Sequence, residues 1–98
     1  MIAIFITYNQ ALHDEVLEIM SHRGIKGYTG WDAVAGRGSN GGEPHLGSHA
    51  WPTMNSAIYS FVEGKSEADK FLAALSELDK KNEHLGLRAF WWEIGGSI

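Results

Sequence analysis

The sequence predicts an α+β fold, a ferredoxin-like βαββαβ sandwich in which an antiparallel four-stranded sheet carries two helices on one face. Three observations support this fold. Segments typical of strands and helices alternate, their order is βαβ, long connection, βαβ, and the 98 residues suffice for one modest core. We therefore expect a single domain over residues 1–98, with a long loop at about residues 35–53.

The first half of the chain begins with a run of β-branched and aromatic residues from Ile2 to Tyr8, typical of a strand buried on both faces. Asn9 is a favourable N-cap for a helix from about Gln10 to Arg23, and Gly24 is placed to end it. One face of this helix carries apolar residues at helical spacing: Leu12, Val16, Ile19 and Met20.

The next segment, Ile25 to Val34, predicts a strand with one exposed or bulged side, because it mixes β-forming residues with Gly27 and Gly30. The segment from Ala35 to Thr53 shows no hydrophobic periodicity, and its glycine, proline, serine and asparagine residues indicate a long connection. Such a loop in a compact domain is usually functional or disordered.

The second half repeats this order. Met54 to Val62 alternates as a strand does, and Ser66 with Asp69 forms a capping box for a second helix that ends before Gly86. An aromatic-rich strand follows from Leu87 to Ile94. The apolar stripe of the second helix consists of Phe71, Leu72, Leu75 and Leu78.

The composition narrows the range of functions. The formal net charge is −4 and the basic residues cluster no further than the pair Lys80 and Lys81, so we expect no nucleic-acid partner. The absence of cysteine excludes a disulfide framework and a thiolate metal site. The apolar N-terminal run is too short to span a bilayer and lacks a basic flank, so we expect a cytoplasmic protein without membrane insertion.

Aromatic side chains are numerous for so small an interior, and four of them are Trp. A sheet with both helices on one face leaves its other face bare, and aromatic residues there favour burial by another subunit of a dimer or trimer. Neighbours on a strand point to opposite faces, so we expect one of Trp91 and Trp92 in the core and the other at an interface. We expect His13, His22 and His84 to be solvated.

The segment Gly36–Gly41 matches the pattern G-x-G-x-x-G. A dinucleotide fingerprint also needs a helix that opens within the motif, whereas Gly42-Glu43-Pro44 follows here. Gly36 and Gly38 can still present backbone N–H groups to an anion, with Arg37 as a charge-assisted donor. The alternative is a flexible linker between two strands.

A second group of candidate ligands lies further along the loop. Glu43, His45 and His49 place a carboxylate and two imidazoles within seven residues, a set suited to zinc, copper or nickel. The alternative is a pair of solvated loop histidines. No serine is spaced from a base as a catalytic triad requires, so the sequence does not indicate an enzyme.

The order of elements, the segment from Gly24-Ile25-Lys26 through Gly36-Arg37-Gly38 and the long loop after it resemble the PII signalling family over nearly the whole chain. The resemblance implies a ferredoxin-like homotrimer whose long T-loop docks onto transporters or enzymes, with adenine nucleotides bound between subunits. It implies phosphate contact for Arg37, and it makes Lys81 and Arg88 the substitutes for the family's second nucleotide loop.

The segment EPHLGSHAWPTMNSA, residues 43–57, resembles the loop of divergent PII-like proteins associated with heavy-metal efflux, and the related CutA-like trimers also have metal connections. The resulting hypothesis is a PII-like trimeric regulator that binds a divalent metal such as zinc or copper, or an adenine nucleotide, and controls a membrane transporter or enzyme through its loop. The alternatives are a small dimeric enzyme of the monooxygenase or isomerase type, and a metal-buffering structural trimer.

Overall fold

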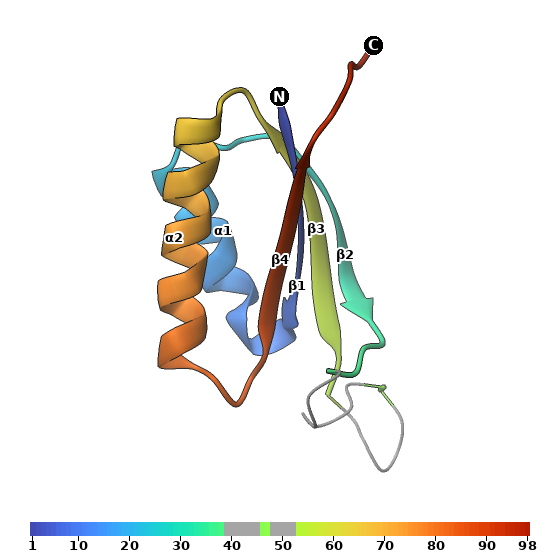
Figure 1. Ribbon diagram of the computed structural model, residues 1–98. Helices are drawn as coiled ribbons and strands as arrows, with labels where there is room; N and C mark the ends of the chain where they lie inside the picture. The colour runs from blue at the N-terminus through green and yellow to red at the C-terminus, as the bar shows by residue number, and fades with distance from the viewer. Residues whose placement is uncertain (39–45, 48–52) are drawn as a thin grey trace.

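The computed structural model describes residues 1–38, 46–47 and 53–98 (Figure 1). Its strands are β1 (Ile2–Asn9), β2 (Tyr28–Val34), β3 (Asn55–Val62) and β4 (Leu87–Glu93). Its helices are the short 3₁₀ helix η1 (Gln10–Leu12), α1 (His13–His22) and α2 (Lys65–Lys81). This order confirms the predicted α+β, ferredoxin-like fold. No helix in the described part of the chain is long and apolar enough to cross a membrane.

The strands form one antiparallel sheet in the order β2-β3-β1-β4, so β2 and β4 are its edges. Figure 1 shows α1 and α2 on the same face of this sheet. The segment that follows β2 and the turn between α2 and β4 lie at one end of the sheet, whereas both chain termini lie at the other (Figure 1). We call the end with the segment after β2 and the turn between α2 and β4 the loop end.

The predicted cap Asn9 begins the 3₁₀ helix η1 and not α1, which follows Leu12 without a side-chain cap, whereas the predicted stop at Gly24 does end α1. The side-chain oxygen of Asn9 accepts a hydrogen bond of 2.9 Å from the amide two residues further on. At the other end, the amide of Ile25 donates to the carbonyl of Met20 at 2.9 Å and Gly24 has φ +71°, a turn that ends a helix and that glycine adopts without strain. Because Ile25 belongs to this turn, β2 begins at Tyr28 and not at Ile25 as predicted.

The capping box predicted for Ser66 and Asp69 is wrong. α2 already begins at Lys65, after an extended Gly64, and no side chain caps it. Ser66 is therefore helical, and Asp69 instead pairs with Lys65 at 3.0 Å on the exposed face. The spacing of four residues that favours this ion pair is a surface feature and contributes little to the start of the helix.

The core lies between the helices and the face of the sheet that they cover. The predicted stripes of both helices are found there, with Ile19 and Leu72 half-buried at its margin. The larger buried side chains are Ile4, Ile6, Tyr8, Leu12, Val16, Met20, Ile58, Phe71, Leu75 and Leu78. Their removal from water is the main force that fixes both helices on this face.

The opposite face of the sheet carries a cluster of aromatic rings. The ring centroid of Tyr59 is 5.5 Å from that of Phe5, 5.4 Å from that of Phe61 and 5.8 Å from that of Trp92. Phe61 and Trp92 nevertheless remain 51% and 42% exposed. We call these four residues the aromatic face.

Trp91 and Trp92 point to opposite faces of β4, but the prediction that one of them is in the core is wrong. Trp91 is 56% exposed and lies beside Leu72 and Leu75 of α2. The reason is the position of β4 at the edge of the sheet, where α2 covers its inner side incompletely.

Candidate functional site

Glycines fix the chain close to the start of β3 at the loop end. A Cβ atom at Gly36 would collide with the side chain of Asn55, the first residue of β3. Gly47 has φ +67°, and a Cβ atom there would collide with the sulfur of Met54. The amide of Gly47 also donates to the carbonyl of Thr53 at 3.2 Å. The positive φ favours glycine at position 47, and at position 36 any other residue would require the side chain of Asn55 to move.

The carbonyl of Asp32 anchors the strand that leads into the loop. The register of β2 against β3 shifts between Trp31 and Val34, which fits the predicted exposed or bulged side of this strand and interrupts the regular ladder at Asp32. The carbonyl oxygen instead accepts hydrogen bonds from Nε2 of Gln10 at 2.6 Å and from Oγ of Ser56 at 2.7 Å. Side chains from η1 and β3 therefore hold the bulge of β2.

A buried phenol lies next to this anchor. Tyr8 is completely buried, and its hydroxyl oxygen lies 2.7 Å from Nδ1 of His13, with the two rings stacked. Burial, with smaller contributions from the nearby Tyr28 and Asp32, raises the pKa of Tyr8 to about 12, although a hydrogen bond with Ser56 acts in the opposite direction. The phenol is therefore a neutral, hydrogen-bonding group at any physiological pH.

The histidine predictions are confirmed in part. His22 and His84 are exposed as expected, whereas the predicted solvation of His13 is wrong, because this side chain is half-buried and hydrogen-bonded to Tyr8. Within residues 1–38, 46–47 and 53–98, no three His, Asp or Glu side chains group as a metal site requires. The predicted metal ligands Glu43, His45 and His49 lie outside the described residues.

The predicted anion-binding residues lie at the loop end but on opposite edges of the sheet. Gly36, Arg37 and Gly38 follow the edge strand β2, and Arg37 is exposed. Lys81 is the last residue of α2, and Arg88 is the second residue of β4, the other edge strand. Three strand spacings, roughly 14 Å, separate the two edges, so a single chain does not bring these residues together.

Lys81 and Arg88 also lie in different layers. Leu87 is buried in the core, so its neighbour Arg88 belongs to the opposite face of the sheet, level with Thr7 of β1. Lys81 lies in the helix layer, in a groove between α1 and α2 that also contains Glu15. Sequence spacing alone did not reveal this separation.

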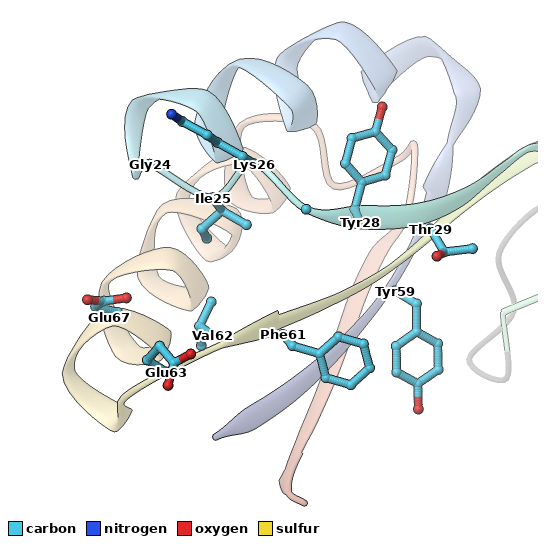
Figure 2. Close-up of a pocket in the computed structure, with 11 residues that line it drawn as sticks. Gly24, Ile25, Lys26, Tyr28, Thr29, Tyr59, Phe61, Val62, Glu63 and Glu67 are labelled. Atoms are coloured by element: carbon cyan, nitrogen blue, oxygen red, sulfur yellow. The ribbon is translucent and has the colours of Figure 1, made fainter. Parts of the chain in front are cut away.

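Sequence reasoning missed a hollow at the other end of the sheet. It measures about 370 Å³ and is lined by the turn 24–27, the first two residues of β2, the end of β3 with Glu63, and Glu67 of α2. Figure 2 shows the carboxylates of Glu63 and Glu67 near each other, with Lys26 above them. The hollow is formed by segments far apart in the sequence, so no local pattern signals it, and none of its residues belongs to the predicted site.

No family model and no curated protein matches this sequence. Solved structures do match. CPII, a nitrogen regulatory PII-like protein from Thiomonas intermedia K12 bound to ADP, AMP and bicarbonate, has a TM-score of 0.75 at 18% identity, and the match covers 95% of this chain and 84% of that chain. The apo form of CPII gives a TM-score of 0.65 at 12% identity, covering 98% and 92%.

A protein assigned to the PII-like signalling proteins, from Thermus thermophilus, gives a TM-score of 0.66 at 24% identity, covering 93% of this chain and 83% of that chain. The matches cover nearly the whole of this chain. The chain therefore has the fold of the PII-like nitrogen regulatory proteins, as the resemblance in its sequence predicts.

Proposed function

We propose that this protein is a PII-like signalling protein that binds a small ligand at the loop end of its sheet and passes the signal on through its long loop. The observation that carries the proposal is the PII-like fold together with the place of Arg37, between two glycines where β2 leads into the loop. Backbone N–H groups and a guanidinium suit a phosphate group. CPII was solved with ADP, AMP and bicarbonate, which supports an adenine nucleotide as the ligand.

The proposed assembly is a homotrimer. The basic residues lie on opposite edges of the sheet, so a head-to-tail ring would place Arg37 of one subunit near Lys81 and Arg88 of the next. Burial of the aromatic face, on which Phe61 and Trp92 are half exposed, would supply the driving force. A closed ring would also cover the exposed sheet edges, which otherwise invite aggregation.

Ligand binding would order the loop of residues 35–53 and so present it to a membrane transporter or an enzyme in the cytoplasm. Such a switch would act through the loop and leave the core unchanged. In the metal-responsive form of the proposal, Glu43, His45 and His49 bind zinc or copper, and the partner belongs to a heavy-metal efflux system.

Native mass spectrometry with ADP tests the nucleotide proposal. We expect a trimer that binds ADP in whole-number stoichiometry. Arg37→Ala should weaken binding about tenfold or more, because a charge-assisted hydrogen bond is lost. Arg23→Ala is the matched control, since Arg23 is an exposed arginine at the end of α1, away from the loop end. A dimer without affinity for ADP would contradict the proposal and favour the dimeric enzyme.

Titration of metal-stripped protein with zinc or copper tests the metal-responsive form. The double variant His45→Ala/His49→Ala should lose the metal, whereas the double variant His22→Ala/His84→Ala should retain it, because both of these histidines are exposed and lie outside the loop. Equal affinity in the two double variants would reject a metal site in the loop. A trimer that binds neither metal nor ADP, with a protease-resistant loop, would indicate a structural trimer.

A further inference from the structure

Two buried serines of β3 form hydrogen bonds to backbone carbonyl groups near the two ends of the edge strand β2. Oγ of Ser56 donates to the carbonyl of Asp32 at 2.7 Å, and Oγ of Ser60 donates to the carbonyl of Gly27 at 2.8 Å. The two serines are 1% and 0% exposed, and they flank the core residue Ile58 on the same face of the sheet. The contacts are chemically equivalent and act at opposite ends of one strand.

Among the described residues, the contact between Ser56 and Asp32 at the loop end is linked to the helix layer by further polar side chains. Ser56 stands directly opposite Tyr8 in the ladder between β1 and β3, and both side chains are buried on the same face of the sheet. The Tyr8 hydroxyl in turn lies 2.7 Å from Nδ1 of His13, the first residue of α1. A line of hydrogen-bonding groups thus runs from α1 through β1 and β3 to the carbonyl of Asp32.

The carbonyl at the end of this line lies in the bulge of β2, where side chains take over from the regular ladder. Gly36, whose backbone lies close to the side chain of Asn55, follows four residues after Asp32. The chain spans at most about 3.5 Å per residue, so Gly36 lies within roughly 14 Å of Asp32, and Asp32 is the hydrogen-bonded anchor that precedes it in β2.

We propose that Tyr8, Ser56 and His13 are positioning residues for the loop, which hold the carbonyl of Asp32, and with it the start of the loop at Gly36–Gly38, from the first turn of α1. This inference rests on the proposed function, because the ligand site that these residues would regulate is the one proposed at Arg37. The regulating residues lie where η1 meets α1. The coupling is reciprocal. A ligand that holds Arg37 in place also strengthens the contact between Tyr8 and His13.

Residue-resolved amide hydrogen exchange of the protein without ligand tests this proposal. Ser56→Ala and Tyr8→Phe each remove one hydroxyl group and keep the shape of the side chain. We expect amides of residues 31–36 to exchange about fivefold faster in both variants, as the loss of one hydrogen bond implies. Ser60→Ala is the matched control: it should accelerate exchange near Gly27 and leave residues 31–36 within about twofold of the wild type.

Unchanged exchange of residues 31–36 in both variants would overturn the proposal, as would an equal acceleration there in Ser60→Ala. A wild-type protein without protection at residues 31–36 would overturn it too, because the strand would then not be held. The measurement needs no ligand, so a protein that fails to bind ADP still gives a clear result. If ADP does bind, Ser56→Ala should weaken its affinity more than Ser60→Ala does.

Discussion

The ring of Trp92 stands edge-on to the ring of Tyr59, with centroids 5.8 Å apart and an interplanar angle of 84°. Trp92 belongs to β4 and Tyr59 to β3, so this contact bridges the central strand β1. Ala3 of β1 pairs with Trp92 and is fully buried although no helix covers its face of the sheet. Large rings that lean over a small residue form a continuous apolar surface within one chain, ready to meet a partner.

Trp92→Ser should therefore dissociate the proposed trimer. Truncation of an aromatic anchor at the centre of an interface costs roughly 2 kcal/mol or more, and this loss recurs in every subunit. Trp91→Ser is the matched control, because Trp91 is the neighbouring residue, is at least as exposed and points to the other face of β4. Sedimentation velocity measures both variants. Dissociation by Trp91→Ser but not by Trp92→Ser would show that the aromatic face is not the interface.

Tyr8 predicts a loss of stability at alkaline pH. Its pKa is about 12 in the folded protein against a reference value of 10.0, so between these values the unfolded chain releases a proton that the folded chain retains. The stabilisation from the neutral phenol is complete below pH 10 and is lost as the pH rises through the folded pKa, by up to about 3 kcal/mol.

Urea denaturation of the wild type and of Tyr8→Phe measures this effect. The difference in unfolding free energy between the two proteins should stay constant below pH 10 and then shift against the wild type as the pH approaches 12. Tyr59→Phe is the control, because Tyr59 lies on the aromatic face and not in the core. A difference that is independent of pH would mean that Tyr8 ionises as readily in the folded chain as in the unfolded one.

Gly36→Ala should destabilise the loop end. The new methyl group would displace the end of the half-buried Asn55 side chain, so we expect a cost of about 1 kcal/mol, the low end for overpacking. Gly27→Ala is the control, because a Cβ atom at Gly27 meets nothing within 4 Å, and we expect a change within about 0.5 kcal/mol. Thermal denaturation compares the two variants, and equal midpoints would contradict the close approach at Gly36.

The elements of the fold could be predicted because the spacing of apolar residues in the sequence reflects which side of each element is buried. Val16 and Met20 repeat at helical spacing because one side of α1 faces the core, and Gly24 ends that helix because its φ of +71° suits glycine. The start of α2 was misplaced because the capping signal at Ser66 is local, whereas the helix begins after Gly64. Local signals compete, and packing decides between them.

The candidate site was predicted less well, because its residues come together through tertiary contacts. In the sequence, His13 resembles any surface histidine at the start of a helix. Only the structure shows that the hydroxyl of Tyr8, from β1, lies 2.7 Å from its Nδ1 atom. Arg37 and Arg88 both lie at the loop end, but the strand order that puts them on opposite edges is not encoded in a local pattern. The sequence points to the glycine-flanked arginine, and the structure adds that Arg88 of the same chain lies at the other edge of the sheet.

Mixed trimers test the proposed head-to-tail ring most directly. In a head-to-tail ring each site takes Arg37 from one subunit and Arg88 from the next, so Arg37→Ala and Arg88→Ala homotrimers should both bind ADP weakly. When the two variants are coexpressed, a site is intact where a subunit that keeps Arg37 lies next to a subunit that keeps Arg88. Random mixing should therefore restore full affinity at about a quarter of the sites. Native mass spectrometry separates these species. If the mixed trimers bind ADP no better than the two homotrimers, the two arginines do not share a site across the subunit boundary.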